Sequence, residues 1–529
     1  MSKDFASAAS GMTTARMPAD GGVQPSAVRP RPWAAVWRLS REQWIVFGAV
    51  ILIVTFRSAL FVFRESLSFD SDEAVTGLMA KHLVGWRAFP LFFYGQNYML
   101  GVEAWLAAPV FLALGASVAT LKLPLLALNI AVGLLLVRLL EREVGLRPGL
   151  ALVASLFFLI PPLGSTSVLL GAIGGNVEPF LYALLLWRTR YRPAWFGLIL
   201  GVGFLQREFT IYAALGVIAV EMLDGAWRHQ ERRRDLWRAL RVVAEVWLVV
   251  QFLRTFASPA GPGSTLAAIS NAPGNNLIEL SNRLCVDPRT FLRGVQRLVT
   301  VHWTQLFGIE AEHAYSYGIE SNVPMGLAGS GFVFGAAALV VFWRIARQFR
   351  LVAARWTELR FCLYLTLVGA ISAGVYVVGR CGADSALRYD MLALLGAVGL
   401  GAWFFAVEDQ VWFRRVGVIV IAGWALVSGV PHARLWIEQT SHPPVAAKAM
   451  IIRNLDARGI KYAMADYWIA YYITFMTDER IIVAAETFAR MPDYERIVLE
   501  HRAEAIRISR QPCDDGKMVV EGVYFCPLN

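Results

Sequence analysis

Apolar segments long enough to cross a lipid bilayer recur along most of this sequence, and short loops rich in arginine separate them. Hydrophobic residues make up 57% of the 529 positions and the mean hydropathy is +0.50, as in polytopic membrane proteins. The formal net charge of +10 would suit a nucleic-acid binder, but the arginines gather in the loops, as the positive-inside rule expects of cytoplasmic loops. We therefore predict an α-helical polytopic membrane protein that does not bind nucleic acid.

Eleven spans place the amino terminus inside, the carboxyl terminus outside and every basic loop on one side. The segment at 99–114 is apolar but short and contains Glu103 and Pro109, so we interpret it as a helix along the outer surface. Counting it as a span would move the basic loop at 138–147 to the outside. The predicted spans are residues 44–63, 119–140, 149–163, 179–187, 194–205, 209–223, 242–256, 326–343, 361–379, 391–406 and 416–430.

The two ends of the chain differ from this membrane region. Residues 1–41 are rich in Ala, Pro, Gly and Arg and lack apolar periodicity, which predicts a disordered cytoplasmic tail. Residues 42–431 form the predicted membrane domain, with a first outer loop at 64–118 and a long outer loop at 257–325. From 432 to 529 hydropathy falls, and short strand-like and helix-like segments alternate, which predicts a small extracytoplasmic α/β domain.

Within this last region, residues 461–465 and 480–484 are predicted strands and 518–525 a hairpin. Four of the five cysteines lie in segments assigned to the outside, where oxidising conditions permit disulfides. Cys513 and Cys526 bracket the hairpin, so we predict that they pair.

The other three cysteines carry weaker predictions. Cys285 and Cys381 form a second candidate pair, although nothing local brings their loops together. Cys362 lies at the inner end of a span, where we expect a buried thiol.

Three carboxylates, Asp70, Asp72 and Glu73, follow the first span directly. Ionisable residues beside hydrocarbon are costly and indicate a functional site. A helical pattern follows them, and Phe89-Pro90 breaks it. The aromatic run at 92–98 then suits the level of lipid headgroups. The stretch predicts an acidic pocket at a membrane surface.

Residues 70–115 resemble the first extracytoplasmic loop of the GT-C glycosyltransferases, a superfamily of integral membrane enzymes that includes bacterial aminoarabinose transferase and the protein O-mannosyltransferases. The matching features are the Asp72-Glu73 pair, Gly77 and Ala80, Gly85, and the Tyr94-Gly95-Gln96-x-Tyr98 run before a second apolar helix. The run Tyr462–Trp468 with Thr474-Phe475 is similar to the tail of some uncharacterised bacterial GT-C proteins, and we attach no chemistry to it.

The resemblance implies transfer of a sugar from a polyprenyl-phosphate-linked donor to a lipid, glycan or protein acceptor. It places the reaction on the outer face of the bacterial inner membrane, with membrane lipids as further partners. Such transfer needs a base for the acceptor hydroxyl and cations that steady the departing phosphate. Asp72 is the predicted base, and Glu73 is predicted to orient the acceptor or the neighbours of Asp72. Asp70 either binds a divalent cation with Asp72, which the sequence does not require, or caps the helix. In the alternative reading, all three acids only complement the helix dipole.

The remaining candidates are predicted to bind substrate. Arg388 is the preferred ligand for the donor phosphate, because Arg388-Tyr389 resembles a pair that opens a late helix in many GT-C proteins. An Asn occupies position 176, where the resemblance leads us to expect an acid, which weakens a metal site. The full set is Asp70, Tyr94, Gln96, Tyr98, Glu103, Asn176, Glu178, Arg207, Arg380, Arg388 and Tyr389.

Simpler roles are open for several of these residues. Glu178 would cap a helix broken at Gly174-Gly175, Glu103 and Arg388 would snorkel to water, and Arg207 would pair with Glu208.

A transporter or flippase of lipid-linked sugars is the alternative function, since it too would need charges within the membrane. Transporters usually show two halves with matching interrupted helices. Here the acids gather in the first outer loop without a counterpart, which favours the enzyme. A membrane-anchored binding protein would leave the acidic loop unexplained. The sequence shows neither a phosphate-binding P-loop nor a dinucleotide fingerprint, and its histidines lack the spacing of a metal site.

Overall fold

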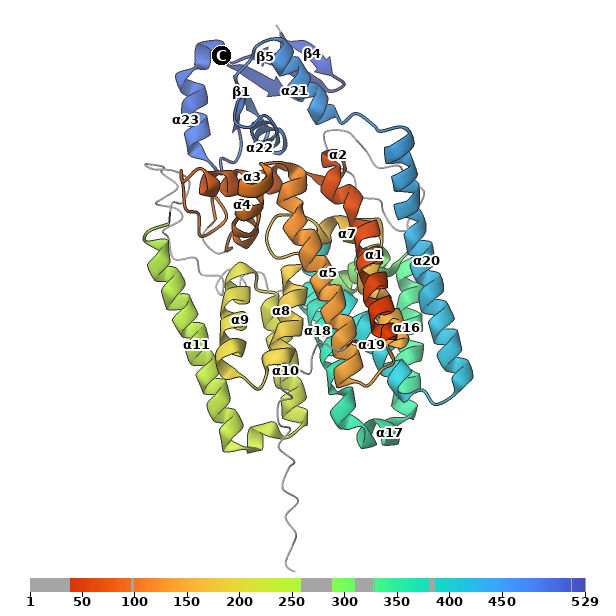
Figure 1. Cartoon of the computed structure of the whole chain (residues 1–529). Helices are drawn as coiled ribbons and strands as arrows, with labels where there is room; N and C mark the ends of the chain where they lie inside the picture. Colours follow the sequence, from red (N-terminus) through yellow and green to blue (C-terminus); the bar gives the residue numbers. More distant parts are fainter. Residues whose placement is uncertain are drawn as a thin grey trace, which may run out of the picture.

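The computed structural model describes residues 39–96, 99–257, 288–309, 327, 329–379, 386–514 and 516–528. Most of its helices run side by side as a bundle, and a small sheet with α21, α22 and α23 lies at one end of that bundle (Figure 1).

Each of the eleven predicted spans corresponds to a helix. These helices are α1 (Arg41–Phe63), α5 (Val118–Glu143), α6 (Pro148–Leu159), α8 (Glu178–Thr189), α9 (Pro193–Gln206), α10 (Thr210–Leu223), α11 (Gln230–Arg254), α16 (Ser330–Arg347), α18 (Trp356–Gly379), α19 (Ala393–Val407) and α20 (Val411–Ser441). Sequence signals fix several of their starts. Ser40 and Gln43 form a capping box before α1, and proline occupies the first turn of α6 and α9.

Among the described helices, five are long and apolar enough to cross a membrane: α1, α5, α16, α18 and α20. The pair formed by α6 and α7 (Leu163–Leu169) would make a sixth span, bent by 85°. The helices α9, α10 and α19 are apolar but have only 14 or 15 residues. The structure therefore supports a polytopic membrane protein, and the count of eleven spans stays a prediction.

Small residues allow close contact between neighbouring helices of the bundle. A Cβ atom added to Gly369 of α18 would lie 2.6 Å from Cα of Gly396 in α19. Such contacts are typical of membrane helices, which associate through close packing. Cys362 of α18 is a buried free thiol, as expected.

The first outer loop lies between the bundle and the C-terminal sheet (Figure 1). It contains α2 (Glu65–Ser68), α3 (Ser71–Val84) and α4 (Val102–Leu114). At 13 residues, α4 is about as short as α6, α8, α9 and α10, so its length does not distinguish a surface helix from a span, and the surface helix stays a prediction.

Several shorter elements complete the membrane region. They are η2 (Ala226–Arg228), α14 (Pro288–Arg297), η3 (Leu298–His302), α15 (Trp303–Phe307), α17 (Phe349–Ala354) and η4 (Leu387–Tyr389). Of the long outer loop predicted at 257–325, the structure describes residue 257 and residues 288–309.

The C-terminal region is an α/β unit, as predicted. Its elements are α21 (Ala447–Ala457), β1 (Tyr462–Ala465), α22 (Tyr467–Met476), β2 (Ile482–Ala485), α23 (Pro492–Glu500), η5 (Arg502–Glu504), β3 (Ile506–Ser509), β4 (Lys517–Val520) and β5 (Val523–Pro527). The strand order is β2-β1-β3-β5-β4, in which β1 is parallel to β2 and β3, and β5 is antiparallel to β3 and β4. The boundary predicted between residues 431 and 432 falls inside α20, because this helix continues through Pro431 to Ser441.

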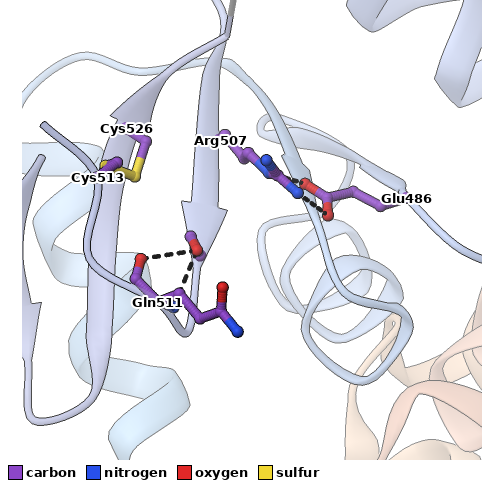
Figure 2. Close-up of a disulfide and its surroundings, with 6 residues drawn as sticks. Glu486, Arg507, Gln511, Cys513 and Cys526 are labelled. Atoms are coloured by element: carbon purple, nitrogen blue, oxygen red, sulfur yellow. Dashed lines mark hydrogen bonds and ion pairs between the residues drawn. A yellow bond between two sulfur atoms is a disulfide. The ribbon is translucent and has the colours of Figure 1, made fainter.

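The predicted disulfide between Cys513 and Cys526 is confirmed, with 6.1 Å between the two Cα atoms. It links β5 to the connection between β3 and β4, and Figure 2 shows it near the ion pair of Arg507 with Glu486. Cys285 and Cys381 lie outside the described residues.

Candidate functional site

The acidic cluster lies at the start of α3, and Asp70 caps this helix. The backbone of Asp70 is extended, and its carboxylate accepts a hydrogen bond of 3.0 Å from the backbone N–H of Glu73. Burial, followed by the charges of Glu73 and Asp72, raises the pKa of Asp70 to about 7. Of the two roles predicted for Asp70, the structure shows the helix cap. In the part of the chain that it describes, no group of three or more potential metal ligands occurs.

Asp72 is held by two side chains of the C-terminal region. The hydroxyl of Tyr467 donates a hydrogen bond to Oδ1 of Asp72, and Nη2 of Arg490 lies 3.9 Å from the same oxygen. Nε of Arg490 also donates to the hydroxyl of Tyr467, at 3.3 Å. The Asp72 side chain is 20% exposed, and within the described residues its Oδ2 accepts no hydrogen bond. One oxygen is therefore fixed and the other is open.

The aromatic run of the first outer loop meets the acids through Arg490. The guanidinium carbon of Arg490 lies 5.1 Å from the ring centroid of Phe93. Gly95 has φ +69°, and a Cβ atom there would lie 3.0 Å from Cδ of Arg490. Only glycine suits this backbone conformation without strain, so the loop can approach Arg490 closely.

The predicted substrate contacts in this run have different surroundings. Tyr94 is buried, and its hydroxyl lies 2.9 Å from Nδ1 of His82. The Oε1 atom of Gln96 is buried and, within the described residues, lacks a hydrogen-bond partner. Tyr98 lies outside the described residues.

Glu73 ties α3 to the bundle. Its carboxylate is 2% exposed and forms an ion pair of 2.9 Å with the buried Lys122 of α5. Its Oε1 accepts a hydrogen bond of 2.7 Å from the backbone N–H of Ala172. Burial raises the pKa of Glu73, and Lys122 opposes that shift. These contacts fix where the first turn of α3 lies relative to the loop at 171–177.

This loop is shaped by glycines and by Arg207. Gly174 and Gly175 have φ of +83° and +74°. A Cβ atom on Gly175 would lie 1.9 Å from Cγ of Arg207, so only glycine leaves room for that side chain. Arg207 Nε donates a hydrogen bond of 3.0 Å to the carbonyl of Gly174. Asn176 closes the loop by donating to the carbonyl of Gly171, at 2.9 Å.

Glu103 and Glu178 accept hydrogen bonds from backbone N–H groups of the same loop. Their side chains are 4% and 3% exposed. Glu103 accepts hydrogen bonds of 3.1 Å from the N–H of Gly175 and from the amide of Gln206, and Glu178 accepts one of 3.1 Å from the N–H of Asn176. Direct contact of either carboxylate with a substrate stays a prediction.

Two arginines lie beside a pair of neighbouring aromatic rings, those of Phe209 and Tyr389. The guanidinium carbon of Arg207 lies 6.0 Å from the ring of Phe209, which in turn lies 5.8 Å from the ring of Tyr389. The guanidinium carbon of Arg388 lies 5.5 Å from that same Tyr389 ring. Within the described residues, Arg207 forms no ion pair with Glu208, and the buried Nε of Arg388 has no hydrogen-bond partner. Arg380 lies outside the described residues.

A second contact docks the C-terminal region on α3. Glu479 accepts a hydrogen bond of 3.0 Å from Arg87 and lies 3.3 Å from the ammonium group of Lys81. Gly77 lies on α3 between Asp72 and Lys81, and a Cβ atom on it would lie 2.4 Å from the ring of Phe475. The close approach of α3 and α22 thus depends on a glycine of the resembling motif.

Comparison with known proteins gives distant structural similarity only. No family model matches the chain, and no curated protein matches it. Solved structures of ArnT from Cupriavidus metallidurans are structural neighbours. The apo form is 12% identical over 88% of this chain and 92% of that chain, with a TM-score of 0.36. The form bound to undecaprenyl phosphate is 10% identical over 92% and 98%, with a TM-score of 0.37. These values identify no family.

Sequence reasoning missed Tyr467, Arg490 and Lys122. Lys122 carried a signal, because a lysine near the outer end of an apolar span needs a buried partner. Tyr467 lies in the C-terminal run that resembles other GT-C proteins, but nothing in that run pointed to Asp72. Arg490 carried no signal.

Proposed function

We propose that this chain is a GT-C-type glycosyltransferase. It moves a sugar from a polyprenyl-phosphate-linked donor to a lipid, glycan or protein acceptor on the outer face of the inner membrane. The observation that carries this proposal is the state of Asp72, a partly exposed carboxylate with one oxygen held by Tyr467 and the other open.

In this reaction Asp72 acts as the general base. Its Oδ2 takes the proton from the acceptor hydroxyl as that oxygen attacks the anomeric carbon of the sugar. A new glycosidic C–O bond forms, the bond from the anomeric carbon to the phosphate oxygen breaks, and its electron pair leaves with the polyprenyl phosphate. Tyr467 and Arg490 keep the carboxylate in place, so that Oδ2 faces the acceptor.

The departing phosphate needs cations, and Arg388 and Arg207 supply them. The buried Nε of Arg388 has no hydrogen-bond partner within the described residues, and a guanidinium binds phosphate through two parallel hydrogen bonds. Tyr389 and Phe209 set the spacing of the two arginines. Arg380 and Tyr98 remain proposed substrate ligands.

The other acids have supporting roles. Glu73 positions the first turn of α3 through Lys122, and Asp70 caps that turn. Glu103, Asn176 and Glu178 hold the loop against which Arg207 lies. These residues act through Asp72 or Arg207, so we propose positioning as their main contribution.

One observation favours the enzyme over a transporter. Transporters built from repeats carry interrupted helices at corresponding places in both halves. Among the described helices, one bent pair is found, α6 with α7, and a matching pair in the second half is not.

Lipid and glycan analysis of a deletion strain tests the proposal. Wild-type chain should restore a glycosylated product that the deletion strain lacks, and Asp72→Asn should not, although it inserts normally. Asp409→Asn is the matched control, because Asp409 is exposed and forms no ion pair within the described residues. Restoration of the product by Asp72→Asn would reject Asp72 as the base, and a product unchanged by the deletion would reject the function.

A further inference from the structure

A cavity of about 620 Å³ lies at the end of the bundle opposite the C-terminal sheet, between the α5–α6 turn and the start of α20. Figure 1 shows α20 running from this end to the C-terminal region. At about 1.5 Å per residue, the 31 residues of α20 span roughly 45 Å. None of the candidate site residues lines this cavity, so it is separate from the proposed active site.

The polar wall of the cavity carries an excess of positive charge. Arg147, Arg355, Arg414 and Arg415 line it. Within the described residues, neither Arg147 nor Arg415 has a carboxylate partner, and the buried Nε of Arg414 has no hydrogen-bond partner.

Two carboxylates near this wall, Glu358 and Glu408, are already paired. Arg355 forms an ion pair of 2.6 Å with Glu358. The carboxylate of Glu408 is 2.8 Å from Arg344, and its backbone carbonyl accepts the hydrogen bond of Arg414. Arg147, Arg414 and Arg415 thus form no ion pair within the described residues, and the exposed Asp409 before Gln410 is a single neighbouring carboxylate that forms none either.

Two helices begin at the same cavity. The N-cap of α6 is Arg147 and that of α20 is Gln410, and neither side chain caps its helix. The N–H groups of a first helical turn have no partner within the helix, and the helix dipole favours an anion beside them. The two helix N-termini and the three arginines therefore both favour a negatively charged ligand.

The rest of the cavity wall is apolar, and part of it lies one helical turn beyond the arginines on α6 and α20. It includes Leu150, Phe405 and Val418, together with Ile419 of α20, which is 68% exposed. Because α20 is long and apolar enough to cross a membrane, its exposed side chains are placed to face lipid tails. A soluble anion would gain nothing from such a wall, whereas a lipid would cover it.

We propose that this cavity binds an anionic phospholipid. The phosphate lies between Arg147, Arg414 and Arg415, and an acyl chain lies along Ile419 and Val418. This site does not depend on the proposed glycosyl transfer.

The test is a lipid titration of the purified full-length chain followed by native mass spectrometry. The probes are dioleoyl phosphatidylglycerol and dioleoyl phosphatidylcholine in a neutral detergent. The double variant Arg147→Gln, Arg415→Gln removes two exposed arginines that form no ion pair within the described residues, so folding should be kept. Its matched control, Arg233→Gln, Arg234→Gln, removes two exposed arginines at the start of α11, outside the cavity.

We expect wild type and the control to bind the first phosphatidylglycerol molecule tightly. The cavity variant should bind it about tenfold more weakly or worse, because each arginine beside an anionic headgroup strengthens lipid binding severalfold. Binding of phosphatidylcholine should be equal in all three proteins. Equal weakening in both variants would mean general surface charge and would overturn the proposal, as would no weakening in either. Displacement of phosphatidylglycerol by millimolar inorganic phosphate would overturn it in favour of a soluble anion.

Discussion

The Tyr467 hydroxyl determines which oxygen of Asp72 remains open to a substrate. A first-turn aspartate would otherwise turn freely between water and the orphan N–H groups of its own helix. The hydrogen bond from Tyr467, with Arg490 behind it, fixes the carboxylate across 395 positions of sequence. No local pattern could predict this contact, whereas the helix cap at Asp70 and the acids of the first turn were visible in the sequence.

Replacing Tyr467 with Phe should slow transfer without unfolding the protein. A hydrogen bond to a charged group contributes roughly 1.5–3 kcal/mol, which corresponds to a rate about 10- to 100-fold lower. Tyr472→Phe is the control on the same helix, because its hydroxyl makes no hydrogen bond to a described residue. The measurement is the rate of sugar transfer in membrane vesicles. Equal rates for the two variants would show that Tyr467 does not position Asp72.

Replacing Asp70 with Asn should change how stability depends on pH. Because the pKa of Asp70 is about 7 in the folded chain and ordinary when unfolded, the folded state holds a proton that the unfolded state has lost between about pH 4 and pH 7. This residue therefore lowers wild-type stability as pH rises through that window. Asparagine keeps the helix cap and does not titrate.

This pH dependence is tested by measuring the apparent unfolding temperatures of wild type and Asp70→Asn in detergent between pH 4 and pH 8. The unfolding temperature of Asp70→Asn should rise relative to that of wild type as pH rises, and the difference between the two temperatures should be largest above pH 7. A constant difference across the range would show that burial does not perturb Asp70.

Among the elements, α3 contacts both the helix bundle and the C-terminal region. Its first turn contacts α5 through Lys122, its middle packs on α22 at Gly77, and its last turn binds Glu479. The sequence predicted the helix and its motif glycine, but not the reason for that glycine, which is the ring of Phe475 brought there by the tertiary fold.

The helices of the bundle were largely predictable, because apolar runs and proline or glycine breaks mark them directly. Two features were not. The span predicted to end at residue 430 continues as α20 to Ser441, because this helix accommodates Pro431. The span predicted at 149–163 runs past the end of α6 at Leu159, and neither the bend nor the helix α7 that follows it was predicted.

Replacing Glu479 with Gln should loosen the docking of the C-terminal region. Although burial acts the other way, hydrogen bonds from His82 and Arg87 hold the pKa of Glu479 well below its usual range. This stabilisation is therefore present above the ordinary glutamate pKa and is lost as pH falls below it. Leaving such partners unpaired costs roughly 1–3 kcal/mol, so trypsin should release the C-terminal region about tenfold faster at pH 7.

Glu486→Gln is the control, because Glu486 forms its two hydrogen bonds with Arg507 inside the C-terminal region, as Figure 2 shows. It should leave the release rate near that of wild type. Equal acceleration by both variants would place the weakness inside the C-terminal region and not at its contact with α3.

For the molecule as a whole, the basic loops predict the orientation in the membrane. Reporter fusions at 228–241 and 344–360 should read as cytoplasmic, and fusions within 64–96 and 442–528 as extracytoplasmic. A fusion near Arg142 distinguishes the two readings of α4. An outside signal there would make α4 a span and would reverse the side of every later segment.

The central claim concerns bond cleavage, so release of free polyprenyl phosphate by the purified full-length chain tests it most directly. The reaction contains a polyprenyl-phosphate-linked sugar and an acceptor extract from membranes of the deletion strain. Wild type should release polyprenyl phosphate as the sugar appears on an acceptor, and Asp72→Asn should do so about 10²–10⁴ times more slowly while still binding the donor. Release by Asp72→Asn at the wild-type rate, or donor that wild type carries across a vesicle membrane with its sugar–phosphate bond intact, would contradict the account.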